Sequence, residues 1–188
     1  AVTAKSISKQ VQEQLAFLGM GSCRFSVAIR PLAEKGPSAA GAEQIEFLVA
    51  TNPGAEPGPL ARIASGGELS RISLAIQVII ASRSTTPTVI FDEVDVGIGG
   101  ATADAVGSLL QTLGQRIQVV CVTHLPQVAA RGAQHLRANK SSNGESTSAA
   151  LTPLAADERV EELARMLGGK TVTKKTREHA REMLESAA

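Results

Sequence analysis

The chain has 188 residues, of which 43% are hydrophobic and 20% charged, so it can bury a core and is not a disordered tail. Its 19 Lys and Arg nearly balance its 18 Asp and Glu, which gives a net charge of +1. This balance argues against nucleic-acid binding that depends mainly on charge, and an aromatic content of 2% argues against a base-stacking surface.

Two cysteines, Cys23 and Cys121, lie far apart in the sequence, and Cys121 sits within an apolar run. This pattern favours free thiols in a reducing compartment, by default the cytosol, over a disulfide scaffold. No apolar stretch is long enough for a membrane span, and no signal-peptide pattern opens the chain. The chain starts in a helical pattern without an initiator Met, so we expect a segment joined to something upstream.

The N-terminal part is predicted to combine one helix with two strands. Apolar residues on one narrow stripe in 3–18 predict a helix typical of a coiled-coil strand, although a helix packed on the domain surface fits the same pattern. Alternating apolar residues in 25–29 and 45–49 predict two antiparallel strands. Residues 51–59 contain three Pro and two Gly, so an irregular loop should follow.

The middle of the chain has the pattern of a helix followed by a βαβ unit. A helical pattern in 68–84 precedes a short β-branched run at 88–91, a helix at 101–113 and a second apolar run at 117–122. A strand, helix and strand of this length predict parallel strands. Because neither strand alternates with polar residues, we expect both faces of the sheet to be covered.

Shorter elements complete an α/β fold with a mostly parallel sheet flanked by helices. We expect a short helix at 127–131, strands at 134–138 and 148–154, and helices at 157–167 and 174–186. The basic residues of the last helix are interleaved with Glu, which favours a solvated helix face over a DNA contact.

Polar pairs follow both strands of the βαβ unit: Asp92 and Glu93 after one, Thr123 and His124 after the other. Because parallel strands end at one edge of a sheet, where ligands bind, these side chains should face a common cleft. An apolar strand that ends in Asp-Glu has the form of a Walker B motif, in which Asp92 would hold Mg²⁺ and Glu93 would orient or deprotonate the water that attacks a γ-phosphate. Two solvated acids at a strand end are the alternative.

A second group of residues lies where a helix should begin, namely Ser65, Gly66, Gly67 and Glu68. Ser65 and Glu68 have the spacing of a capping box. The two glycines add nothing to capping, but they let backbone amides approach a phosphate at the positive end of the helix. These residues are therefore candidates for an anion cradle.

The order of these motifs resembles the second half of an ABC-type ATPase head. By that resemblance, residues 65–68 match the signature motif, Asp92 and Glu93 match Walker B, Asp95 lies in the D-loop, and His124 matches the switch histidine that senses the γ-phosphate. The resemblance assigns Glu93 and His124 to catalysis, Asp92 to the metal, and residues 65–68 with Asp95 to nucleotide binding.

Longer stretches narrow the resemblance to one family. Residues 63–71, 90–95 and 123–130 closely resemble the RecN family of bacterial DNA repair proteins, and residues 159–169 fit as well. These proteins resemble the structural-maintenance-of-chromosomes (SMC) class, in which two halves of an ATPase head are joined through an antiparallel coiled coil.

The resemblance implies a role in DNA double-strand break repair, with ATP and Mg²⁺ as cofactors. Residues 1–20 would be the end of the coiled-coil arm, and residues 21–188 the C-terminal lobe of the head. The implied partners are the N-terminal lobe of the same head, a second head in a homodimer, and DNA through the whole protein, in the cytoplasm at the nucleoid and without a membrane. Two alternatives stay open: a non-catalytic dimerising scaffold, and the nucleotide-binding half of another SMC-like or transporter ATPase.

The sequence holds no Gly-x-x-x-x-Gly-Lys-Ser/Thr loop, so the Walker A and Q-loops are expected in an N-terminal half. Residues 169–171 read Gly-Lys-Thr, but the first glycine of the motif falls on Ala164, and the segment follows a helix. Val96 and Gly99 stand where many relatives carry Thr and Ser, which leaves the detailed geometry of the D-loop open.

Overall fold

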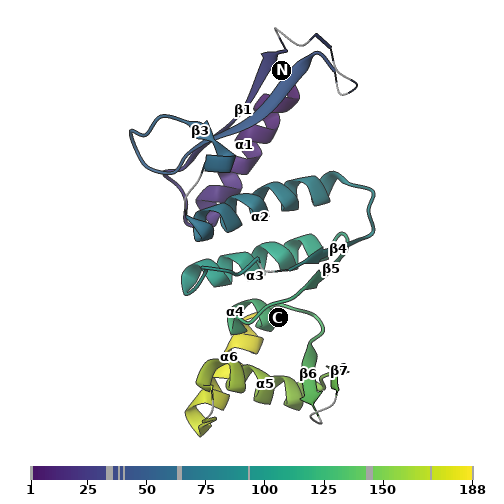
Figure 1. Cartoon of the computed structure of the whole chain (residues 1–188). Coiled ribbons are helices and arrows are strands. Elements are labelled where there is room, and N and C mark those ends of the chain that lie inside the picture. Colours follow the sequence, from purple (N-terminus) through teal and green to yellow (C-terminus); the bar gives the residue numbers. More distant parts are fainter. Residues whose placement is uncertain are drawn as a thin grey trace.

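The computed structural model describes residues 2–32, 36–37, 39, 41–62, 65–92, 94–142, 146–169 and 171–187. Glu93, predicted above to activate water, lies outside the described residues. The elements are stacked in chain order from an N-terminal sheet to a pair of C-terminal helices (Figure 1). Within the described part of the chain, no helix is long and apolar enough to cross a bilayer.

The N-terminal layer is a helix packed on a small antiparallel sheet. Its elements are α1 (Val2–Phe17), β1 (Arg24–Pro31), β2 (Glu43–Ala50) and β3 (Gly58–Pro59), followed by the short helix η1 (Leu60–Arg62). The antiparallel pairing of the two predicted strands is confirmed, and β3 adds a third strand beside β2. The sequence does not predict β3, because its two residues, Gly and Pro, are types that strands disfavour.

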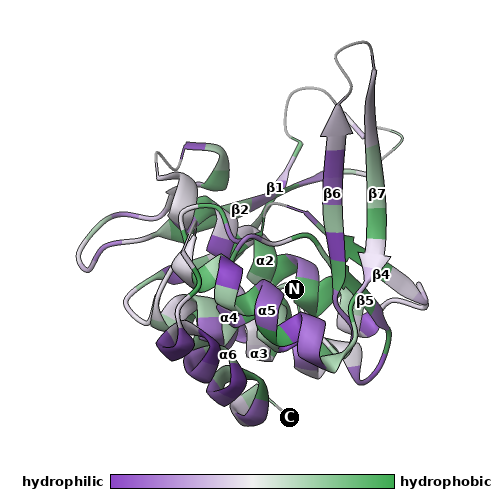
Figure 2. Cartoon of the chain, turned by 90° about the horizontal axis from the view of Figure 1, so that it is seen from below, coloured by the Kyte–Doolittle hydropathy of each residue, from purple (hydrophilic) through white to green (hydrophobic). Residues whose placement is uncertain are grey.

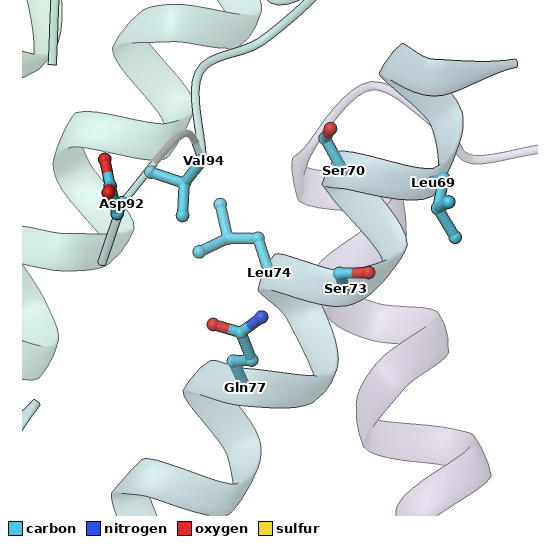
Figure 3. A pocket seen from close by; sticks show the side chains of 7 residues that line it. All are labelled: Leu69, Ser70, Ser73, Leu74, Gln77, Asp92 and Val94. Carbon is cyan, nitrogen blue, oxygen red and sulfur yellow. The ribbon is translucent and has the colours of Figure 1, made fainter. Parts of the chain in front are cut away.

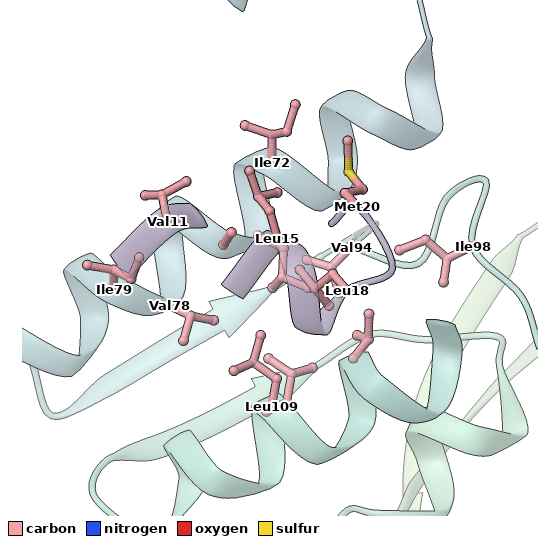
Figure 4. Packing of buried hydrophobic residues seen from close by; sticks show 14 of the residues in the cluster. Val11, Leu15, Leu18, Met20, Ile72, Val78, Ile79, Val94, Ile98 and Leu109 are labelled. Carbon is pink, nitrogen blue, oxygen red and sulfur yellow. The ribbon is translucent and has the colours of Figure 1, made fainter. Parts of the chain in front are cut away.

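The apolar stripe of α1 is part of the core. Val11, Leu15 and Leu18 are fully buried and point toward the centre of the molecule (Figure 4). On the same helix, Ser8 and Gln12 accept hydrogen bonds from backbone N–H groups of β1 at 3.1 and 3.0 Å, which covers the free edge of that strand. The assignment of residues 1–20 to a coiled-coil arm stays a prediction.

The central layer combines two helices with a parallel strand pair. Its elements are α2 (Gly66–Arg83), β4 (Thr88–Phe91), α3 (Ala101–Gly114) and β5 (Gln118–Cys121). Strands β4 and β5 are parallel along their whole length, as the βαβ pattern predicts.

The parallel sheet is smaller than predicted, and one of its faces is bare. Among the described residues it consists of β4 and β5, whereas the other strands form antiparallel sheets. Ile90, Val120 and Val122 lie on one face and are 68%, 41% and 56% exposed, although the sequence predicts cover on both faces. The prediction fails here because an apolar strand shows that a face is suited to burial, but not that the same chain supplies the cover.

The C-terminal layer is a helix pair with a hairpin. Its elements are α4 (Pro126–Ala130), β6 (Leu136–Ser142), β7 (Thr147–Pro153), α5 (Ala156–Gly168) and α6 (Lys174–Ala187). The antiparallel hairpin β6–β7 extends away from the helices (Figure 2). Helix α4 joins the two buried clusters of the molecule, because Val128 belongs to the first and Ala130 to the second, which α5 and α6 complete.

A buried carboxylate joins α5 to β6. The side chain of Glu162 is 5% exposed and accepts two hydrogen bonds from Arg165, at 2.6 and 3.0 Å. On the other side, Arg137 Nη1 lies 3.9 Å from Glu162 Oε2. The hydrogen bond from Arg165 lowers the pKa of Glu162 below its ordinary value, even though burial acts in the opposite direction. The folded state therefore favours the ionised carboxylate.

We expect Glu162→Gln to lower the free energy of unfolding by about 1–3 kcal/mol, because it removes the charge that two arginines address. The folded-state pKa is lowered, so this contribution is present above the unfolded pKa of about 4.3 and is lost as the pH falls through the folded pKa. The difference between the two proteins should be full at neutral pH and shrink below about pH 4. Denaturant unfolding of the purified chain over a pH series measures it.

Glu161→Gln, one residue earlier on the same helix, is the matched control. Glu161 pairs with Arg177 at 2.7 Å on the surface, and exposed pairs of this kind contribute less than about 1 kcal/mol. Equal losses for the two variants would contradict the special role of Glu162.

Candidate functional site

Asp92 and the Thr123–His124 turn leave the β4–β5 sheet at one edge. Phe91 and Cys121 are aligned, and the Val122 N–H donates to the Phe91 carbonyl at 2.9 Å, so both strands end at the same level. Asp92 is exposed directly after β4, and the Thr123–His124 turn follows β5. The shared sheet edge agrees with the sequence analysis for these residues, while the common cleft and the chemical roles stay predictions.

Negative charge gathers at this edge of the sheet. Burial raises the pKa of the Cys121 thiol to about 11, and the carboxylates of Asp95 and Asp92 add to the rise. Cys23 and Cys121 are free thiols, as the sequence predicts, and a thiol with this pKa stays protonated at neutral pH. The two carboxylates act on the Cys121 thiol in the same direction, so both place negative charge near the end of β5.

Asp92 is the described carboxylate available at this edge for the Mg²⁺ that the sequence analysis predicts. Among the described residues, no group of three or more His, Cys, Asp or Glu could hold a metal ion. Mg²⁺ in nucleotide sites needs one or two carboxylates, because waters and substrate phosphates supply the other ligands. Asp92 borders a groove of about 240 Å³, and the wall opposite it is a face of α2 that carries Ser70, Ser73 and Gln77 (Figure 3).

Asp95 faces the interior. It is 3% exposed, and its Oδ2 accepts hydrogen bonds from Thr123 Oγ1 at 2.5 Å and from the His124 backbone N–H at 3.0 Å. His124 Nδ1 lies 3.2 Å from the same oxygen, while the His124 side chain is 71% exposed. The sequence predicts nucleotide contact for Asp95, whereas the structure gives its carboxylate partners within the chain.

The predicted signature residues form the exposed start of α2. Ser65 is the N-cap, and its Oγ accepts a hydrogen bond from the Glu68 N–H at 3.5 Å, which is one half of the expected capping box. Ser65 and Gly66 are exposed. Because the first amides of a helix have no acceptor within it, this turn can receive an anion. No hydrogen bond in the described part of the chain joins Ser65 to Asp92 or His124.

The signature turn touches the loop that follows β4. Gly67 packs on Gly97 so closely that a Cβ atom on Gly67 would lie 3.0 Å from the Gly97 carbonyl oxygen. Gly97 has a φ of +70°, a conformation that favours glycine. Because Asp95 belongs to the same loop, residues 94–98 contact the signature turn on one side and the Thr123–His124 turn on the other.

The sequence analysis assigns no role to Arg71, which stabilises the signature turn. Its Nε donates to the Gly67 carbonyl at 3.1 Å, and its Nη1 donates to the Leu18 carbonyl at 3.5 Å. The spacing from Gly67 to Arg71 on one helix is the signal that could have indicated the first contact. The contact with Leu18 joins residues far apart in sequence, which no local pattern reveals.

The chain is similar over nearly its whole length to bacterial proteins named DNA repair protein RecN. It is 48% identical over 182 residues to the protein of Xylella fastidiosa strain 9a5c, 46% over 183 residues to that of Haemophilus influenzae, and 42% over 189 residues to that of Treponema pallidum. The predicted resemblance to RecN proteins is confirmed for this segment. These alignments cover 97 or 98% of the chain but 33% of each relative, so it spans about a third of the RecN proteins it matches. No family model matches it.

Solved heads of SMC ATPases share the fold of this chain. An SMC ATPase studied for ATP-driven dimerization and DNA stimulated activation superposes with a TM-score of 0.63 at 18% identity, over 90% of this chain and 96% of that chain. The Smc head domain of Pyrococcus yayanosii, with a coiled coil and joint, gives a TM-score of 0.66 at 18% identity, over 85% of this chain and 28% of that chain. The predicted fold class is confirmed.

We expect Gly67→Ala to lower the free energy of unfolding by about 1–3 kcal/mol, because the added methyl group meets a backbone carbonyl that cannot rotate away. Gly66→Ala is the matched control, since a Cβ atom there meets nothing within 4 Å. In a helix that replacement should be neutral or stabilise by up to about 1 kcal/mol. Denaturant unfolding of both purified variants measures the difference, and equal stability would show that the Gly67–Gly97 contact is looser than described.

Proposed function

We propose that the chain is the C-terminal lobe of an ATP-hydrolysing head in a RecN-type protein of DNA double-strand break repair. The observation that carries the proposal is the common sheet edge at which Asp92 and the Thr123–His124 turn leave two parallel strands. The names of the RecN relatives support the repair role, and the likeness to SMC ATPase heads supports ATP-driven dimerisation of heads.

At this edge, each polar side chain has one task in the proposed reaction. Asp92 binds Mg²⁺, which neutralises phosphate charge when ATP is bound. Glu93 orients the attacking water and accepts its proton, an assignment that rests on the sequence. His124, exposed beside Asp92 at the strand ends, contacts the γ-phosphate.

The signature turn serves a different nucleotide in this proposal. Ser65, Gly66 and Gly67 bind the phosphates of ATP held by a second head, so that ATP joins two copies into a dimer, and Glu68 caps the helix behind them. The exposure of Ser65 and Gly66 at the positive end of an 18-residue helix supports this role. A nucleotide bound between two heads is then contacted by both.

A second lobe of the same head covers the bare face of β4 and β5. The face formed by Ile90, Val120 and Val122 is apolar and exposed, and such patches typically mark interaction sites. The chain has no Walker A loop of its own and spans about a third of its RecN relatives. We therefore assign the Walker A and Q-loops to an N-terminal lobe that docks on this face.

DNA contact belongs to the whole protein in this proposal, acting in the cytoplasm at the nucleoid. The net charge of +1 argues against DNA binding by this lobe that depends mainly on charge. Two basic side chains of α6 form ion pairs, with Lys174 3.9 Å from Glu178 and Arg177 2.7 Å from Glu161.

In a complete RecN-type protein that carries this segment, we expect Glu93→Gln to slow phosphate release by roughly 10²–10⁴-fold, because the water loses its base. Binding of Mg-ATP should persist, so the ATP-bound dimer accumulates. Asp92→Asn, the same acid-to-amide change one residue earlier, should instead abolish Mg²⁺-dependent nucleotide binding and dimerisation. Size-exclusion chromatography with light scattering, with and without Mg-ATP, beside phosphate release, measures both variants.

Three results would overturn parts of this proposal. A Glu93→Gln protein that hydrolyses ATP at the parent rate would remove Glu93 from the reaction. A parent protein that dimerises with ATP but never hydrolyses it would be a dimerising scaffold. Mg²⁺-dependent turnover by the present chain alone would place the complete catalytic site in this lobe.

A further inference from the structure

The half-buried side chain of Arg71 joins two backbone carbonyls from different parts of the chain. Its Nε donates to the Gly67 carbonyl at 3.1 Å, and its Nη1 donates to the Leu18 carbonyl at 3.5 Å. Gly67 belongs to the signature turn, whereas Leu18 directly follows α1. A guanidinium group holds its donors in a planar fork, so it can serve both acceptors at once.

The Leu18 carbonyl is an acceptor whose place is set by the core. Beyond α1, Gly19 adopts a φ of +77°, and the Met20 N–H donates to the Leu15 carbonyl at 2.8 Å, which is the pattern of a Schellman helix end. Leu15 and Leu18 are fully buried in the same cluster as Ile72 of α2 (Figure 4). A cation is a favoured partner for the carbonyls at the C-terminal end of a helix.

The signature turn needs such an anchor, because its own residues constrain it poorly. Gly66 and Gly67 belong to the residue type with the greatest backbone freedom. The cap bond from the Glu68 N–H to Ser65 Oγ is long, at 3.5 Å. The close approach of Gly67 to Gly97 is a packing contact, which resists compression but does not hold the turn in place. The hydrogen bond from Arg71 supplies that hold.

The charge of Arg71 suits the ligand assigned to this turn. A cation beside the first turn of a helix opposes the helix dipole, so this placement does not stabilise α2 as a cation near its C-terminal end would. A phosphate at the same turn, in contrast, is attracted by both the dipole and the guanidinium. Because the guanidinium is bonded to two carbonyls, it acts through the turn.

We propose that Arg71 is a positioning residue, which holds Gly66 and Gly67 where their amides meet the phosphates of ATP bound to a second head. The identity of this ligand rests on the proposed function. The anchoring of the turn does not, and it is measurable in the present chain.

Backbone ¹⁵N relaxation of the present chain tests the anchoring. Arg71→Met keeps an unbranched apolar side chain and removes the guanidinium. We expect the order parameters of Gly66 and Gly67 to fall from about 0.85, typical of a rigid backbone, to below about 0.6 in this variant. Arg83→Met, which changes an exposed Arg in the last turn of the same helix, is the matched control and should leave both values unchanged. Equal order parameters in Arg71→Met and the unmodified chain would overturn the proposal.

Arg71→Lys separates the bridge between two carbonyls from the effect of charge alone. An ammonium group keeps the charge but lacks the planar fork that serves both acceptors. We expect Gly66 and Gly67 to remain more mobile in this variant than in the unmodified chain. Order parameters restored to the values of the unmodified chain would show that charge is sufficient, and the positioning role of the bridge would then be wrong.

The complete RecN-type protein tests the consequence for dimerisation. With Mg²⁺ and a non-hydrolysable ATP analogue, we expect Arg71→Met to weaken dimerisation by about 10–100-fold, the effect of losing hydrogen bonds from a charged group. The affinity of a single head for the analogue should change by less than about 3-fold, because the turn serves the nucleotide of the other head. Analytical ultracentrifugation measures the first quantity, and titration with a fluorescent analogue at low protein concentration measures the second. Equal losses in both would mean a structural role only.

The two arms separate the possible failures. If the parent protein dimerises with the analogue and Arg71→Met dimerises equally well, the positioning role is wrong while the proposed function stands. If the parent protein does not dimerise with nucleotide, the proposed function is wrong, and the order parameters of Gly66 and Gly67 decide the anchoring by themselves.

Discussion

The loop after β4 is held between two other turns, and the geometry of the candidate site depends on this constraint. Asp95 fastens the loop to the Thr123–His124 turn through a buried oxygen, and Gly97 packs backbone to backbone on Gly67. Neither contact yields easily, because a buried carboxylate that loses its donors is left uncompensated and the two glycines leave no space. A displacement of the loop therefore moves the switch histidine and the signature turn together.

These two contacts of the loop matter because the proposed dimer holds two nucleotides. In that proposal, Asp92 and His124 serve the ATP of their own head, whereas the turn at Ser65 serves the ATP of the other. Residues 94–98 contact both groups of residues, so one loop of this lobe lies between the parts assigned to the two nucleotides. Arg71 extends the connection, because it ties the Gly67 carbonyl to the Leu18 carbonyl beyond the end of α1. Arg71 thus links the segment predicted to end a coiled-coil arm to the turn that contacts the second head in our proposal.

The sequence reveals those parts of the site that depend on neighbours along the chain or on strand order. The N-cap at Ser65 follows from local spacing, and the common edge of Asp92 and His124 follows from a βαβ unit whose strands must be parallel. The inward direction of Asp95 could not be predicted, because an acid in a glycine-rich loop has the same local pattern whether it faces solvent or a backbone 29 residues away. The Arg71–Leu18 contact and strand β3 also depend on long-range packing.

The bare face of β4 and β5 is apolar and exposed, and it lies outside the core of this chain. The two buried clusters are built from residues of this chain and are joined through α4, so the core does not include Ile90, Val120 or Val122. Ser65, Asp92 and His124 are also exposed and do not belong to the buried clusters. In our proposal, a second lobe therefore covers the site and the bare sheet face, whereas the buried clusters need no residues from outside this chain. Two heads that join through the Ser65 turn, as we propose, can therefore associate and separate without disturbing the core of this lobe, because Ser65 and Gly66 are exposed.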